Sequence, residues 1–302
     1  MLDAWNGHPQ VQATLQEASD ALGQDIGQLI HQGPKEELAL TTNTQPVMLV
    51  AAVAAYRVWV AEGGTQPAYV AGHSLGEYSA LVASGVLTLT QAVPLVRLRA
   101  QAMQEAVAVG AGAMAAVLGL EAAKVVALCE QAQAEFASDS GEVVQAANFN
   151  DPGQTVISGS KAAVDKACEL LKAAGAKRTL PLPVSAPFHC ALMRPAAERL
   201  RDHLSRVELQ SPRIPVINNI DVAQETDVAR IRDALYRQAF GPVRWVETIE
   251  RMQQLGVSHV VECGPGKVLA GMVKRINPAL HAQAMFDPQT LSDTRTFLTE
   301  QA

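Results

Sequence analysis

A serine flanked by glycines is the feature of this sequence with the clearest chemical potential. The segment Gly72-His73-Ser74-Leu75-Gly76 follows a short apolar run and precedes helix-forming residues. Glycines two residues before and after a serine, between a strand and a helix, are typical of a nucleophile elbow, in which both glycines relieve crowding at a strained turn. The pattern predicts that Ser74 is a nucleophile and that the Leu75 N–H faces developing negative charge. The alternative is an ordinary Gly-x-Ser-x-Gly turn.

A serine nucleophile needs a base, and histidine is the usual one. Of the seven histidines, His189 is favoured because it follows a proline-stiffened, mostly apolar loop, residues 181–188, ahead of an expected helix. Four others fit less well, because they adjoin the serine on a tight turn or lie in polar loops or on a polar helix face: His73, His8, His31 and His203. The alternative for His189 is a histidine that is only packed within its loop.

An arginine in an apolar stripe is the third candidate. In the helix expected to begin at Thr88 or Thr90 and to end at about Ala108, apolar residues recur at helical spacing and Arg99 falls among them. Arg97 falls outside the stripe and is expected in solvent. A buried guanidinium needs an anion, because an unpaired buried charge is very costly. The anion is a carboxylate of the protein or of a substrate, and periodicity alone favours the protein.

The elements around these residues alternate between strands and helices, which indicates an α/β fold. Residues 112–183 follow the order strand-helix-strand-strand-helix-strand, which predicts a ferredoxin-like α+β subdomain. We expect it to be inserted into a large, mainly parallel α/β domain made of residues 1–111 and 184–302. The other expected elements are a helix at 45–62, a strand at 67–72, helices at 77–84, 192–209 and 227–240, and strands at 214–218 and 259–263.

Composition narrows the class of protein. With 302 residues, 48% of them hydrophobic and 18% charged, the chain can bury a large core. The net charge of −6 argues against nucleic acid as a partner. No apolar stretch is expected to cross a bilayer, and the start has no cleavable signal pattern. The four cysteines lack a Cys-x-x-Cys pair and predict free thiols without a metal site. We expect a soluble cytoplasmic globular protein.

Taken together, the motifs resemble the malonyl-CoA:acyl-carrier-protein transacylase family of bacterial type II fatty-acid synthesis. The resemblance covers nearly the whole chain in order; it includes residues 72–80, the Arg99 segment, and residues 148–154, 188–190, 218–219 and 262–267. It implies a hydrolase-like α/β domain with a ferredoxin-like insertion. It also implies transfer of a malonyl group from coenzyme A to the phosphopantetheine thiol of acyl carrier protein. Malonyl-CoA is then the substrate, no cofactor is implied, and we expect a monomer.

The resemblance also implies roles for individual residues. Ser74 corresponds to the acylated nucleophile and His189 to its general base. Arg99 corresponds to the residue that holds the malonyl carboxylate, which reverses the preference from periodicity. In the family a main-chain carbonyl orients the histidine, and Gln238 matches that position. Leu75 corresponds to an oxyanion-hole N–H.

Three positions correspond to the surroundings of the acyl chain: Leu75, Met103 and Phe188. A bulky Phe188 beside the base leaves little space for an α-methyl branch. In related polyketide acyltransferases a phenylalanine there accompanies malonyl and a serine accompanies methylmalonyl. A methyl clash discriminates by about 1–3 kcal/mol, so malonyl is the expected acyl group.

One feature of the family is missing from this sequence. The family opens with an apolar strand and Phe-Pro-Gly-Gln-Gly-Ser-Gln, whose glutamine supplies a second oxyanion N–H, whereas this sequence begins at Met1-Leu2-Asp3. We expect the natural start to lie upstream. Two other functions stay open: a serine esterase or thioesterase of the α/β class, and an inactive homologue that binds the carrier protein. An esterase is expected to place an acid and then its histidine late in the chain.

Overall fold

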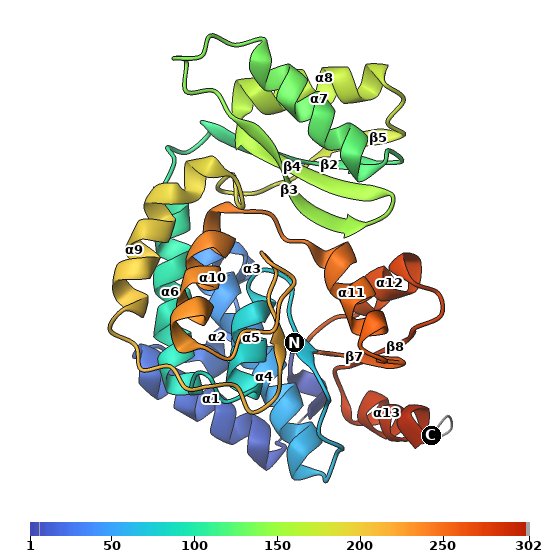
Figure 1. Ribbon diagram of the computed structural model, residues 1–302. Helices are drawn as coiled ribbons and strands as arrows, with labels where there is room; N and C mark the ends of the chain where they lie inside the picture. The colour runs from blue at the N-terminus through green and yellow to red at the C-terminus, as the bar shows by residue number, and fades with distance from the viewer. Residues whose placement is uncertain (6, 300–302) are drawn as a thin grey trace.

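The computed structural model describes residues 1–5 and 7–299, and it places a small layer of strands and helices above a larger, mostly helical body (Figure 1). The described elements, in chain order, are η1 Asp3–Trp5, α1 Pro9–Leu22, α2 Ile26–Gln32, α3 Lys35–Ala39, α4 Thr41–Ala61, β1 Val70–Ala71, α5 Gly76–Ala83, α6 Leu89–Glu105, β2 Gly112–Leu118, α7 Ala122–Ala134, β3 Val144–Asp151, β4 Gln154–Ser160, α8 Lys161–Ala173, β5 Arg178–Pro181, η2 Ala191–Met193, α9 Arg194–Leu204, β6 Val216–Ile217, α10 Val228–Phe240, α11 Trp245–Gln254, β7 His259–Cys263, α12 Val268–Ile276, β8 His281–Met285 and α13 Pro288–Thr299.

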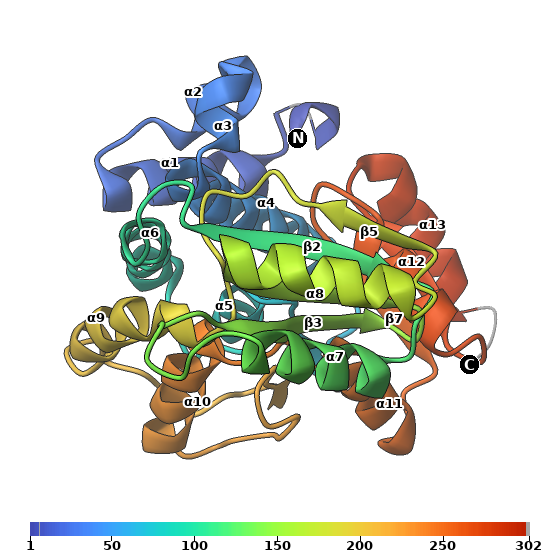
Figure 2. The ribbon, with the colours of Figure 1, turned by 90° about the horizontal axis from the view of Figure 1, so that it is seen from above.

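The small layer is a four-stranded antiparallel sheet in the order β3-β4-β2-β5. Helices α7 and α8 lie on one of its faces, and the other face turns toward the large body (Figure 2). Alternation along β2 matches the two faces: Ala115 and Val117 pack with the helices, whereas Met114 and Ala116 belong to a separate cluster that includes Phe188. The α/β class and the ferredoxin-like insertion are therefore confirmed, while the residue limits of the two domains stay a prediction.

The large body has the parallel strand pairing that the sequence predicts. Its described strands form two separate parallel pairs, β1 with β6 and β7 with β8. The ladder of β1 covers only Val70 and Ala71, because the chain leaves the strand at Gly72 to form a turn. Helices supply most of the core, and strand β1 serves mainly to aim that turn.

Helix α4 is the central helix of the main core, as the Ala/Val-rich segment predicts. The expectation that no apolar stretch could cross a membrane is wrong for this helix, because by length and composition alone it could. Yet 61% of its apolar window is buried inside the protein. It packs against α1, α5 and α6, as a core helix does.

Local chemistry sets the limits of the helices, some of which were expected and some not. Helix α6 begins after Thr88, whose Oγ1 accepts from the Gln91 N–H (3.2 Å) while Gln91 Oε1 accepts from the Thr88 N–H (2.9 Å). The expected helix 192–209 is instead the short turn η2 followed by α9, which has a proline in its first turn and ends at Leu204. His31 lies in α2 and not in a loop, and His8 caps α1.

Candidate active site

Ser74 lies on a sharp turn between β1 and α5. Its backbone is left-handed, with φ of 51°, a conformation that costs a non-glycine residue energy. A Cβ at Gly72 would overlap the carbonyl group of Gly76, so Gly72 is required by close backbone approach. Gly76 is different from expectation: a Cβ there meets no atom within 4 Å and its φ is not positive. The elbow therefore needs a glycine on one side only.

Asn219, which is fully buried, holds both sides of this turn. Its Oδ1 accepts from the Ser74 N–H at 2.7 Å, and its Nδ2 donates to the Gly72 carbonyl at 2.8 Å. The sequence analysis included Asn219 only as part of a motif. A buried polar residue just after a short strand is a signal that could have pointed to it.

His189 reaches Ser74 from the loop before η2. Its Nδ1 donates to the main-chain carbonyl of Gln238 at 3.0 Å, which leaves Nε2 free to accept from Ser74 Oγ at 2.6 Å. His189 also has a left-handed backbone, with φ of 62°. Both members of the pair are thus held in conformations that the surrounding structure must enforce. The other nearby histidine, His73, points away to Asn150 and the Trp245 ring.

The environment of His189 keeps its imidazole neutral. The side chain is 4% exposed, and burial, followed by the positive charge of Arg99, lowers the pKa of His189 to about 3. The Gln238 carbonyl opposes this shift, since it accepts from the ring. A neutral imidazole next to a hydroxyl is the state that a general base requires.

Arg99 lies beside the same serine and is 2% exposed. Its Nη1 donates to Gln45 Oε1 at 2.6 Å, and its Nη2 donates to Ser74 Oγ at 3.1 Å and to Gln238 Oε1 at 3.2 Å. Within the described part of the chain no carboxylate lies within 4 Å of this guanidinium. The pairing that periodicity favoured, with a protein carboxylate, is therefore wrong, and the partners are neutral amides and a hydroxyl.

Gln45 and Gln238 hold the guanidinium from two helices, α4 and α10. Gln238 is fully buried and uses all of its polar groups: Nε2 donates to the Ser74 carbonyl at 2.8 Å, Oε1 accepts from Arg99, and its backbone carbonyl accepts from His189. Gln45 was not singled out from the sequence. The signal for it is a polar residue at the start of a buried apolar helix.

A buried carboxylate, Glu77, lies in the first turn of α5. Burial raises its pKa to about 7, and Arg99 only partly offsets that shift. Its Oε2 accepts from the Asn219 N–H at 2.9 Å and from Gln238 Nε2 at 3.2 Å. The sequence analysis gave Glu77 no role.

The remaining residues singled out from the sequence differ in their burial and contacts. Leu75 is half-buried before α5, and its N–H has no acceptor among the residues that the structure describes. Met103 is 1% exposed within the main core, and Phe188 is half-buried between that core and the sheet of the small layer. Arg97 is not in solvent as expected: it is half-buried and donates to Gln24 at 2.6 Å and Asn43 at 3.2 Å.

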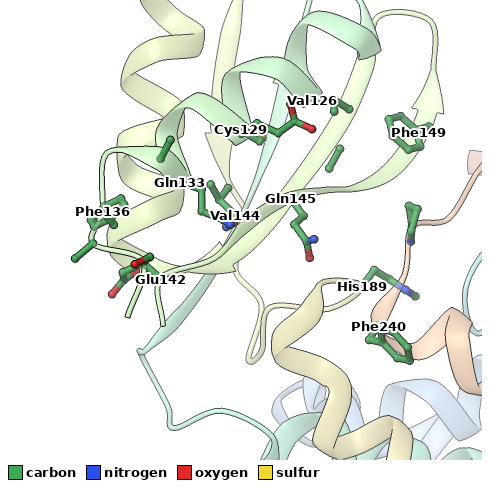
Figure 3. Close-up of a pocket in the computed structure, with 16 residues that line it drawn as sticks. Val126, Cys129, Gln133, Phe136, Glu142, Val144, Gln145, Phe149, His189 and Phe240 are labelled. Atoms are coloured by element: carbon green, nitrogen blue, oxygen red, sulfur yellow. The ribbon is translucent and has the colours of Figure 1, made fainter. Parts of the chain in front are cut away.

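A surface cleft of about 730 Å³ has His189 among its lining residues. It runs between α7 and β3 of the small layer and the end of α10, where Phe240 and Pro242 lie. Figure 3 shows His189 and Phe240 across the gap from Val144 and Gln145. Over residues 1–5 and 7–299, no group of three or more His, Cys, Asp or Glu side chains is arranged to hold a metal ion.

Comparison with known proteins identifies the family. Residues 8–286 match the model of the acyl transferase domain. The malonyl CoA-acyl carrier protein transacylase of Salmonella typhimurium is 52% identical over 289 residues, 96% of this chain and 92% of the relative. The chain belongs to the malonyl-CoA:acyl-carrier-protein transacylase family. The family member from Bacillus subtilis is 44% identical over 94% of this chain and 87% of its own length.

Solved structures of the family share the fold. An acyl-carrier-protein S-malonyltransferase from Burkholderia pseudomallei is 57% identical, with a TM-score of 0.94 over 98% of this chain and 94% of that chain. A malonyl-transacylase in complex with its type II PKS acyl-carrier protein is 48% identical, with a TM-score of 0.93 over 97% of this chain and 93% of that chain. The family fold thus extends over nearly the whole of this chain.

The two glycines of the elbow predict different outcomes on substitution. Gly72→Ala forces a methyl group into the Gly76 carbonyl and should lower the free energy of unfolding by about 3 kcal/mol or more. Gly76→Ala has open space in a helix and should change it by less than about 1 kcal/mol. Urea denaturation of both variants measures this difference. Equal losses would contradict the close approach at Gly72.

Proposed function

We propose that this chain is a malonyl-CoA:acyl-carrier-protein S-malonyltransferase that works through a malonyl ester on Ser74. The observation that carries the proposal is the convergence on Ser74 Oγ of a neutral histidine at 2.6 Å and a buried guanidinium at 3.1 Å. A base activates the hydroxyl, and a cation next to it suits an acyl group that ends in a carboxylate. The family to which the chain belongs supports the same reaction.

In the first half-reaction Ser74 Oγ attacks the thioester carbonyl of malonyl-CoA while His189 Nε2 takes the hydroxyl proton. The Gln238 carbonyl holds the ring in the required tautomer. The Leu75 N–H, at the start of α5, donates to the oxyanion of the tetrahedral intermediate. When the intermediate collapses, the C–S bond breaks and the coenzyme A thiolate takes the proton from His189.

In the second half-reaction the phosphopantetheine thiol of acyl carrier protein attacks the Ser74 ester. His189 takes the thiol proton and returns it to Ser74 Oγ as the ester bond breaks. A relative whose complex with its acyl-carrier protein is known supports this partner. We propose that the cleft beside α7 and β3 admits the thioester arm, because it opens to the surface and His189 is one of its lining residues.

Arg99 is proposed to bind the malonyl carboxylate. That carboxylate is three covalent bonds from the ester oxygen, so it lies within reach of a guanidinium that contacts Ser74 Oγ. The positive charge is buried among neutral partners, and a substrate carboxylate would neutralise it. This argument favours malonyl transfer over simple ester hydrolysis, for which the site would need no buried cation.

Further parts of the proposal rest on the sequence. Leu75, Met103 and Phe188 surround the acyl chain, with Phe188 excluding an α-methyl branch. The enzyme acts in the cytoplasm as a monomer, uses malonyl-CoA as substrate without a cofactor, and binds neither nucleic acid nor membrane. The net charge of −6 is in keeping with the exclusion of nucleic acid.

Removal of the nucleophile and of the base should have separable effects. Ser74→Ala should abolish the covalent adduct, because no other oxygen takes its place. His189→Ala should slow adduct formation by roughly two orders of magnitude or more, since the hydroxyl loses its base. Mass spectrometry after mixing with malonyl-CoA measures both. An adduct that persists in Ser74→Ala would disprove the assignment, and turnover of simple esters without transfer would favour an esterase.

Arg99→Ala should impair malonyl transfer by about 2 kcal/mol or more beyond its effect on acetyl transfer, because only malonyl carries the anion. The matched control is Arg97→Ala, which removes a half-buried arginine of the same helix that bonds to Gln24 and Asn43. It should affect both acyl groups equally. Transfer rates with malonyl-CoA and acetyl-CoA measure the ratio, and an unchanged ratio in Arg99→Ala would contradict the role.

The pKa of His189 predicts an unusual acid limit. With that pKa lowered to about 3, the base stays neutral as pH falls, and single-turnover acylation should be nearly constant from pH 8 to pH 5. A decline with an apparent pKa near the ordinary 6.5 would contradict this. Circular dichroism at each pH is the control, because it shows whether the protein is still folded. The unfolded histidine protonates at higher pH than the folded one, so the free energy of unfolding falls as pH falls from about 6.5 toward 3.

A further inference from the structure

Glu77 is a buried ionisable group that the proposed reaction does not use. It is 2% exposed and lies on α5, one turn after Ser74. One carboxylate oxygen, Oε2, accepts two hydrogen bonds, from the Asn219 backbone N–H (2.9 Å) and from Gln238 Nε2 (3.2 Å). The carboxylate forms no ion pair within 4 Å among the described residues, so its contacts are not those of a salt bridge.

The two donors hold opposite sides of the candidate active site. Asn219 spans the elbow, from the Gly72 carbonyl to the Ser74 N–H. Gln238 bonds to the Ser74 carbonyl and, through its backbone carbonyl, orients His189. Both donors are fully buried, so no water replaces a lost acceptor easily. Glu77 Oε2 is therefore the common acceptor of the two residues that hold the elbow and the histidine.

The geometry points to Glu77 as a positioning residue. Its Oε2 fixes Asn219 and Gln238 and thereby keeps the Ser74 and His189 side chains aligned with each other. It touches neither reacting atom and acts only through those two residues. The inference rests on the proposed function for its malonyl readout. Glu77 supports His189 indirectly, through Gln238, whereas in other serine enzymes the acidic residue of the catalytic triad contacts the histidine directly.

The acceptor role does not depend on the charge of Glu77. Burial raises the pKa of Glu77 to about 7, so the carboxyl is present in both forms near neutral pH. A proton on the other oxygen leaves Oε2 able to accept. A glutamine side chain at this position presents the same acceptor, whereas a leucine of similar size presents none.

The test compares Glu77→Leu with Glu77→Gln by two reactions of Ser74. One is single-turnover malonylation by malonyl-CoA; the other is labelling by a fluorophosphonate, which needs an activated serine but no malonyl group. The rate constant of each reaction is determined for the fraction of the protein that reacts, so that inactive protein does not affect it. Glu77→Leu should slow both reactions about 100-fold, as loss of alignment does, and Glu77→Gln should stay within about threefold of the unchanged protein.

A matched control separates alignment from folding. Asp151 is also a buried carboxylate, which accepts from the Gly153 N–H at 3.0 Å and pairs with Arg275 at 2.8 Å; among the described residues it forms no hydrogen bond with Ser74, Asn219 or Gln238. Asp151→Leu should lower the melting temperature and leave the rate constants unchanged. In addition, Glu77→Leu combined with Asn219→Ala should lose less rate than the two single losses multiplied together, because part of the effect of Glu77 passes through Asn219.

Three results would overturn the inference. In the first, Glu77→Leu reacts at the normal rate but in a smaller fraction of the protein. In the second, Glu77→Gln is as slow as Glu77→Leu, and in the third the rate losses of the two single variants are fully additive, as free energies, in the double variant. Failure of the proposed function is recognised separately. In that case the unchanged protein forms no malonyl adduct, while the fluorophosphonate comparison still tests Glu77.

Discussion

Ser74 occupies left-handed backbone, with φ of 51°, which only glycine adopts without strain, and the centre of the molecule is built to hold it there. Three hydrogen bonds enforce the turn: the Asn219 side chain accepts one from the Ser74 N–H and donates one to the Gly72 carbonyl, and Gln238 Nε2 donates the third to the Ser74 carbonyl. The donors and acceptors come from the turn after β1, from α10 and from the segment after β6, so the turn exists only in the folded protein. Because Gln238 also contacts His189, one residue helps to maintain both the strain of the elbow and the orientation of the base.

Burial determines the electrostatics of the site. Arg99, His189 and Glu77 are each less than 5% exposed, so each charged form is costly unless a partner compensates it. The result is a neutral histidine, a carboxyl with a raised pKa and a guanidinium held by amides. A positive charge that the protein leaves without a close carboxylate is a means of recognising an anionic substrate, since the substrate itself completes the pairing. Gln45 and Gln238 keep the guanidinium aimed without neutralising it.

Much of the fold could be predicted from the sequence because the patterns are local. Helices α5 and α10 were predicted within one residue of their observed limits, since periodicity and caps mark these segments. Helices α11, α12 and α13 were not predicted, although α11 and α12 have clear apolar faces. The end of α9 was misplaced by several residues, because the polar stretch after Leu204 carries no strong stop signal. The division of the large body's described strands into two separate parallel pairs was not predicted, because strand pairing depends on distant segments that no local pattern reveals.

The sequence by itself determined the glycine-flanked turn, the apolar stripe that contains Arg99 and the stiff loop before His189, because each is a property of neighbouring residues. Only the tertiary structure decided what these residues contact. It brought together Ser74 and His189, which are 115 positions apart, and it surrounded Arg99 with glutamines from α4 and α10 instead of a carboxylate. It also gave Asn219 and Glu77 their place beneath the turn. Hydrogen bonds between buried side chains depend on where separate elements meet, and that meeting is fixed by the packing of the whole core.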